Sequence, residues 1–154
     1  MNISILLPYK ENYSPNYAGA VSLFVAATTK ISKHKKNITI FGNTEFKKKL
    51  PGNYKNIELI KNNVFKSQSS IYVNKFIELQ KNINSDIIEI HNRPNYITKL
   101  KTLNKKIVLY FHNDPITMLG SKYIKQRVNL LNDCEKIIFN SEWSKKQFLT
   151  NLNN

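Results

Sequence analysis

Six short apolar runs rich in β-branched residues recur along the 154-residue chain and limit the folds it can adopt. Most of them are continuous rather than alternating in polarity, which is typical of parallel strands covered by helices on both faces. We predict strands over Ile3–Tyr9, Ile38–Phe41, Ile57–Ile60, Ile87–Ile90, Ile107–Phe111 and Ile137–Phe139.

Segments with helical periodicity separate these runs. In Gly19–Ile31 the residues predicted to share a face are Ala20, Phe24, Ala27 and Ile31. In Ser70–Ile83 they are Val73, Phe76, Ile77, Gln80 and Ile83. Further helices are predicted over Pro94–Leu103, after a Ser121 cap with Ile124, Val128 and Leu131 on one face, and after a Ser141 cap.

This alternation of strands and helices predicts the α/β class. We expect a Rossmann-like, doubly wound, mainly parallel sheet of about six strands with helices on both faces. The length fits roughly one domain, so residues 1–154 are expected to form a single one.

The chain carries 24 Lys and Arg against 10 Asp and Glu, a formal net charge of +14 that suggests an anionic partner. Only Arg93 and Arg127 are arginines, whereas nucleic-acid-binding proteins rely on Arg for bidentate contacts. Nucleic acid is therefore a disfavoured partner. The first half of the chain holds the larger share of the positive charge and is expected to face anions, an anionic membrane surface among them.

Cys134 is the only cysteine, and no apolar stretch reaches the length of a membrane-spanning helix. We therefore expect a cytoplasmic protein whose membrane contact, if any, is peripheral and made by lysines at the inner face. Cys134 precedes a predicted strand rather than following one, which disfavours a nucleophilic role.

Polar clusters follow four of the predicted strands, with the sequences KENYSPNYAGA, HNRPNY, HNDP and NSEW. In an open parallel sheet such loops line the crevice at the carboxyl ends of the strands, where ligands bind. His91 and His112 each follow an apolar strand directly. Two histidines at equivalent places suggest a site at which they bind a sugar hydroxyl, move a proton or bind an anion.

The neighbouring polar residues are compatible with more than one role. Asn92 and Asp114 stand just before prolines and suit helix capping as well as ligand contact. The two arginines are candidates for forked contacts with phosphate or carboxylate, and Arg127 equally suits a helix-surface ion pair with Asp133 or Glu135.

Several enzyme classes lack support. The chain contains no GxGxxG dinucleotide loop, no GxxxxGK[ST] phosphate loop and no GxSxG nucleophile turn. Its His, Cys, Asp and Glu residues have no dense metal-ligand spacing, so we expect neither a metal site nor a bound cofactor.

The order of these motifs resembles the N-terminal domain of family 4 (group 1) retaining glycosyltransferases, whose GT-B fold has two Rossmann-like domains. The resemblance spans essentially the whole chain and is carried by DIIEIHNRPNYI, KIVLYFHNDP and CEKIIFNSEWSKKQF. It implies an acceptor-side domain for sugar transfer from a nucleotide-sugar donor to an envelope or capsular glycan or a lipid-linked acceptor.

The resemblance also implies roles for single residues. His112 matches the family's histidine that contacts the transferred sugar and is the expected catalytic residue. Gly19 matches the loop near the donor phosphates, although the family commonly has two adjacent glycines where this chain has Ala18-Gly19. The other implied substrate-binding residues are His91, Asn92, Arg93, Asn113, Asp114, Arg127, Ser141 and Glu142.

The family's donor-binding C-terminal domain, with its paired glutamates, has no counterpart in these residues. The chain is therefore expected to be incomplete as a catalyst alone and to act with a separate C-terminal half, and its standing as an enzyme stays open. Two alternatives are a non-catalytic sugar- or phosphate-binding module and, with less support, a basic nucleic-acid-binding domain.

Overall fold

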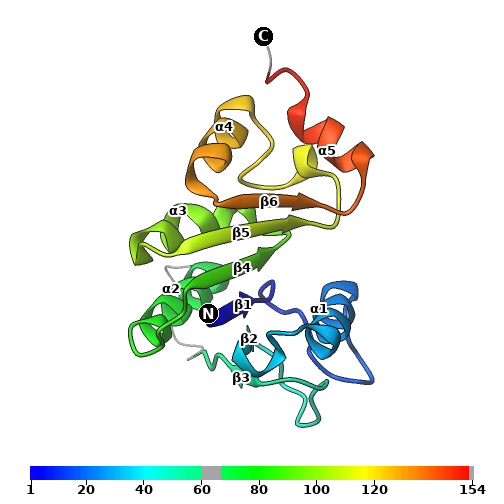
Figure 1. Ribbon diagram of the computed structural model, residues 1–154, viewed down its shortest axis with the longest axis vertical. Helices are drawn as coiled ribbons and strands as arrows, with labels where there is room; N and C mark the ends of the chain where they lie inside the picture. Colours follow the sequence, from blue (N-terminus) through cyan, green and yellow to red (C-terminus); the bar gives the residue numbers. More distant parts are fainter. Residues whose placement is uncertain (60–66, 153–154) are drawn as a thin grey trace.

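The computed structural model describes residues 1–59 and 67–152 as a parallel sheet with helices packed against it (Figure 1). The strands are β1 (Ile3–Leu6), β2 (Ile38–Gly42), β3 (Tyr54–Asn56), β4 (Ile87–His91), β5 (Lys106–Phe111) and β6 (Lys136–Phe139). They pair in the order β3-β2-β1-β4-β5-β6, and every pair is parallel. This is the Rossmann strand order, so the predicted fold class is confirmed.

The helices are α1 (Ala20–Ile31), α2 (Gln68–Gln80), α3 (Ile97–Leu100), α4 (Ile124–Asp133) and α5 (Glu142–Leu149). The described part of the chain also contains four 3-10 turns: Lys35–Asn37, Pro94–Tyr96, Lys101–Leu103 and Pro115–Thr117. The helix predicted over Pro94–Leu103 is therefore a single α-helical turn between two 3-10 turns. Within the described residues, no helix is long and apolar enough to cross a membrane.

Two of the strands differ from their predicted ranges by more than one residue. β1 ends at Leu6, before Pro8, which has no backbone N–H to donate. β3 lies just before the predicted strand Ile57–Ile60, and Ile60 itself is outside the described residues. Ile57 directly follows β3, where its N–H still donates to the Gly42 carbonyl of β2 (2.7 Å), and its side chain is fully buried in a hydrophobic core.

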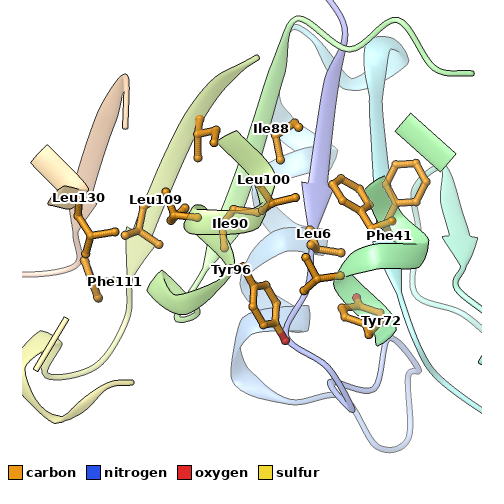
Figure 2. Close-up of a cluster of buried hydrophobic side chains, with 14 of the residues drawn as sticks. Leu6, Phe41, Tyr72, Ile88, Ile90, Tyr96, Leu100, Leu109, Phe111 and Leu130 are labelled. Atoms are coloured by element: carbon orange, nitrogen blue, oxygen red, sulfur yellow. The ribbon is translucent and has the colours of Figure 1, made fainter. Parts of the chain in front are cut away.

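The sheet separates two hydrophobic cores, because successive side chains of a strand point to opposite faces. Leu6 faces the larger core, whereas Ile5 and Leu7 face the smaller one under α1. Figure 2 shows the larger core, in which strand residues such as Leu6, Ile90 and Leu109 pack against side chains that include Tyr72, Tyr96, Leu100 and Leu130. Each such side chain contributes about 1.5–3 kcal/mol through burial.

The structure corrects the predicted faces of two helices. The face of α1 in contact with the sheet is Val21, Ser22, Val25, Ala26 and Thr29, and Ile31 of the predicted stripe is 83% exposed. In α4 the predicted face of Ile124, Val128 and Leu131 is exposed, while Arg127 and Leu130 are buried.

Helix caps were predicted with mixed success. Ser141 caps α5 by accepting from the Ser144 N–H (3.1 Å), as predicted. Ser121 does not cap α4, which begins after Tyr123; it is buried, and its hydroxyl donates to the Pro115 carbonyl (2.5 Å). The predicted buried side of α2 is confirmed for Val73, Phe76 and Gln80, but the helix is capped by Ser67 and ends at Gln80, so Ile83 lies beyond it.

The topology fixes where a ligand would bind. From β1 the chain builds outward through β2 and β3, and α2 then returns it to the other side of β1 to start β4. Ligands of open α/β sheets bind at this switch point, beyond the carboxyl ends of the strands. The loops after β1, β4 and β5 lie there.

Candidate functional site

Two histidines meet at the carboxyl ends of neighbouring strands. His91 is the last residue of β4 and pairs in register with Tyr110 of β5, so His112, two residues on from Tyr110, lies on the same face. His91 Nδ1 lies 2.8 Å from His112 Nε2. His91 is fully buried, whereas His112 is partly exposed. The two residues with the strongest predicted role thus form one unit.

Glu89 extends this unit to three residues. Its Oε1 lies 2.8 Å from His91 Nε2, and its side chain is about one quarter exposed. Sequence reasoning missed Glu89 because it stands inside the run IIEIH, which was interpreted as an uninterrupted buried strand. A usable signal was present, since residues two apart on a strand share a face and Glu89 therefore had to lie beside His91.

Aromatic rings hold His112 in place. The Tyr110 ring stacks on it with centroids 4.4 Å apart, and the Phe24 ring of α1 meets it edge-on at 4.8 Å. Burial, and then the neighbouring His91, lower the pKa of His112 to about 4, while the Glu89 charge acts in the opposite direction. His112 is therefore a neutral imidazole at neutral pH.

Two asparagines fix the backbone of His112. Asn92 adopts a left-handed conformation (φ 51°) and its Oδ1 accepts from the His112 N–H at 2.7 Å. Asn140, after β6, donates from Nδ2 to the His112 carbonyl at 2.6 Å. The capping role considered for Asn92 is therefore wrong, because its side chain bridges β4 and β5 instead.

The other predicted residues around the histidines have varied surroundings. Asp114 does cap the turn after it, since its Oδ1 accepts from the Ile116 N–H (3.1 Å). Arg93 donates from Nη1 to the Asn92 carbonyl (2.8 Å), and Asn113 is exposed. Ser141 and the exposed Glu142 line an open hollow of about 500 Å³ at the end of β6.

Gly19 has a structural reason to be glycine. It is the N-cap of α1, and a Cβ there would overlap the Glu11 carboxylate. That carboxylate accepts from the Ser22 N–H in the first turn of the helix (3.1 Å). The position that the family resemblance assigned to donor phosphates is thus filled by the chain's own anion, which satisfies the helix N-terminus.

Arg127 does not reach the crevice. It is 3% exposed, and its guanidinium donates to the carbonyls of Ser121, Lys122 and Thr150 at 3.3, 3.0 and 2.7 Å. The predicted ligand contact and the alternative surface ion pair are both corrected, because these N–H groups tie α4 to the segment after α5. The acidic residues considered for that pair bind lysines: Asp133 binds Lys101, and Glu135 binds Lys106.

A groove of about 250 Å³ runs along the sheet face that carries the histidines. Phe24, Glu89, Tyr110 and Ile138 are among the residues that line it. No group of three or more His, Cys, Asp or Glu side chains in residues 1–59 and 67–152 is arranged to hold a metal ion. Burial and the nearby Asp133 charge raise the pKa of Cys134 to about 12, so its sulfur is a thiol.

Comparisons with known proteins do not show a family for this chain. No family model matches the chain, and no curated protein does. Among solved structures, the chain is similar to a UDP-glucosyltransferase from Polygonum tinctorium that glucosylates indoxyl, in complex with 3,4-dichloroaniline, at 9% identity and a TM-score of 0.44. The match covers 85% of this chain and 33% of that protein, so this chain spans about a third of its length.

Proposed function

We propose that this chain is the acceptor-side domain of a retaining glycosyltransferase that transfers sugar from a nucleotide-sugar donor to a glycan or lipid-linked acceptor. The observation that carries the proposal is the 2.8 Å contact between His91 and His112 at the carboxyl ends of β4 and β5. Ligands of this sheet type bind at that end. The motif order that resembles family 4 supports the same conclusion.

In this proposal the ring of His112 contacts a hydroxyl of the transferred sugar. Asn92 and Asn140 hold its backbone on both sides, and Tyr110 and Phe24 hold its ring. Ser141 and Glu142, which line the hollow beyond β6, are proposed to lie near the rim of the cleft. A donor half, supplied as a separate chain or segment, binds the nucleotide.

The protonation of the site favours sugar over phosphate as the ligand of this domain. A histidine whose pKa lies near 4 carries no positive charge at neutral pH to attract an anion. The α1 N-terminus is likewise occupied by Glu11. The same observation supports a second candidate function, that of a non-catalytic sugar-binding module. Such a module would bind sugar but would transfer none to an acceptor when a donor half is supplied.

Ligand-observed NMR with a panel of neutral methyl glycosides tests the proposal. We expect saturation transfer to at least one glycoside, lost in His112→Ala. The matched control is His34→Ala, which removes a histidine on the turn after α1, away from the crevice. The proposal is contradicted if no glycoside shows saturation transfer, or if the His112→Ala and His34→Ala variants give equal signals.

We further propose that the outer face of α1 binds anionic membranes peripherally. Leu23 and Ile31 are 52% and 83% exposed on this helix, and Lys33, Lys35 and Lys36 follow it on exposed positions. A helix with apolar residues outward and lysines beside them suits the membrane interface, where each lysine adds about 1 kcal/mol of attraction.

Sedimentation with phosphatidylserine vesicles tests this surface. The triple variant Lys33→Gln, Lys35→Gln, Lys36→Gln is expected to lower vesicle binding by about a hundredfold, from three lysines at about 1 kcal/mol each. A variant with the same charge loss elsewhere, Lys122→Gln, Lys125→Gln, Lys136→Gln, serves as the control. Equal losses in both variants would show that net charge alone governs binding.

A further inference from the structure

The hydrogen-bond chain from Glu89 to His112 has a defined proton order. An ionised carboxylate only accepts hydrogen bonds, so the 2.8 Å contact requires a proton on His91 Nε2. When the His91 imidazole is neutral it carries one N–H, so its Nδ1 is left as an acceptor. The second 2.8 Å contact then requires that His112 donate from Nε2. With a neutral His91, each step follows from the number of protons on the group before it.

The same order decides what His112 presents to a ligand. With its single proton on Nε2, the neutral ring keeps a lone pair on Nδ1. No hydrogen bond reaches that nitrogen from residues 1–59 or 67–152, and the side chain is partly exposed. His112 Nδ1 is therefore an acceptor, which a ligand hydroxyl satisfies and an anion does not.

We infer that Glu89 is a positioning residue, which fixes the tautomer of His112 through His91 and so sets Nδ1 as the hydrogen-bond acceptor of the site. The functional role of Glu89 rests on the proposed function of His112, whereas the positions of the protons do not depend on that function. Glu89 suits this task by position, since its backbone is locked in β4 between β1 and β5 while its carboxylate lines the open groove.

The neighbouring groups do not supply an alternative to Glu89. Tyr110 and Phe24 contact the imidazoles through their ring faces and edges. Asn92 and Asn140 bind only the backbone of His112. Within the described residues, the Glu89 carboxylate is thus the one charged group hydrogen-bonded to the imidazole pair.

Nitrogen NMR of isotope-labelled histidine side chains in the full chain, at neutral pH and without ligand, tests the inference. In the unmodified protein we expect His112 to show a protonated Nε2 and an unprotonated Nδ1. Glu89→Gln keeps an amide oxygen that accepts from His91, so the tautomers are retained. Glu89→Lys places a donor against His91 Nε2, which reverses the order and shifts the His112 Nδ1 signal toward its protonated value.

Glu135→Lys is the matched control, because it reverses the charge of an exposed carboxylate paired with Lys106 on the other end of β5. It should leave both rings unchanged, and the His34 signals serve as an internal reference. A protonated Nδ1 on His112 of the unmodified protein overturns the inference, even if Glu89→Lys does not fold. An unchanged His112 spectrum in folded Glu89→Lys also overturns it.

This experiment uses no sugar, so its outcome is separate from that of the glycoside assay. Correct tautomers with no glycoside binding would contradict the proposed function and leave the role of Glu89 toward His112 intact. Glycoside binding with tautomers indifferent to Glu89 would contradict only the role of Glu89.

Discussion

The loops after β4 and β5 share the pattern His-Asn-x-Pro, yet they fold differently. In His91–Pro94 the asparagine is buried and left-handed, and its side chain binds the next strand's loop. In His112–Pro115 the asparagine is exposed, and the aspartate after it caps a 3-10 turn. Similar sequences thus have different roles, because the first loop holds the backbone of the second through the hydrogen bond between Asn92 and His112.

Position in the sheet explains the difference. β4 lies between β1 and β5, so the loop after it is enclosed and its polar atoms must find protein partners. β5 borders only β4 and the edge strand β6, so its loop is more open to solvent. The buried histidine therefore stands at the start of the enclosed loop, and the partly exposed one at the start of the open loop.

Replacement of Asn92 should separate the two loops most strongly. Asn92→Ala loses the hydrogen bond to His112 and places alanine in left-handed backbone, so we expect a loss of about 2–3 kcal/mol in the free energy of unfolding. Asn92→Gly, which tolerates the backbone, should lose less. Asn113→Ala in the other loop should change stability by less than about 0.5 kcal/mol. Urea unfolding measures all three, and equal losses at the two asparagines would refute the comparison.

The second prediction concerns how the stability contributed by His112, in the open loop, depends on pH. Because the pKa of His112 is about 4 in the folded protein against an ordinary value near 6.5, the unfolded chain takes up a proton first as pH falls. Stability attributable to His112 is therefore retained above about pH 6.5 and lost between there and about pH 4. We expect a loss of about 1–2 kcal/mol, allowing for partial solvent exposure.

Urea unfolding across that pH window is the measurement, with His112→Gln as the test variant. In His112→Gln the free energy of unfolding should fall less steeply between about pH 6.5 and about pH 4 than in the unmodified protein. In His34→Gln it should fall as steeply as in the unmodified protein. A His112→Gln profile parallel to that of the unmodified protein would mean that the ring is not held in its neutral form.

The smallest effect concerns the cap in the open loop. Asp114→Ala removes the acceptor for the Ile116 N–H and should cost about 1 kcal/mol. Arg93, the residue at the same place in the enclosed loop, makes no cap and donates to the Asn92 carbonyl instead. Asp114→Asn, which keeps a capping oxygen, should restore most of the loss in thermal unfolding. No recovery would assign the effect to charge rather than capping.

Much of the fold was predictable because strand signals are local. Apolar, β-branched runs gave four of the six strands to within a residue or so, and the alternation with helices gave the parallel sheet. The histidines were predictable for the same reason, since each directly follows such a run. β3 was displaced because burial of Ile57 in the core produces the same apolar signal as a strand.

Helix faces were harder to predict where hydrophobicity does not single out one side. In AVSLFVAATTKI apolar residues occur all round α1, so the periodicity could not select Val21 and Val25 over Phe24 and Ile31. In α4 the buried face contains Arg127, whose place inside depends on carbonyls at residues 121, 122 and 150. One of these partners, Thr150, is 23 residues away in the sequence, and its contact with Arg127 becomes visible only in the folded chain.

The sequence by itself determined the strands, the sheet class and the two histidines, because these depend on periodicity and on residues next to one another. Tertiary structure alone decided that His91 meets His112, that Asn92 binds the His112 backbone and that Glu11 occupies the start of α1. Each of these contacts joins residues of different elements or loops through a hydrogen bond of about 3 Å. Strand register and helix packing bring these hydrogen-bonding atoms together, and neither register nor packing can be read from neighbouring residues in the sequence.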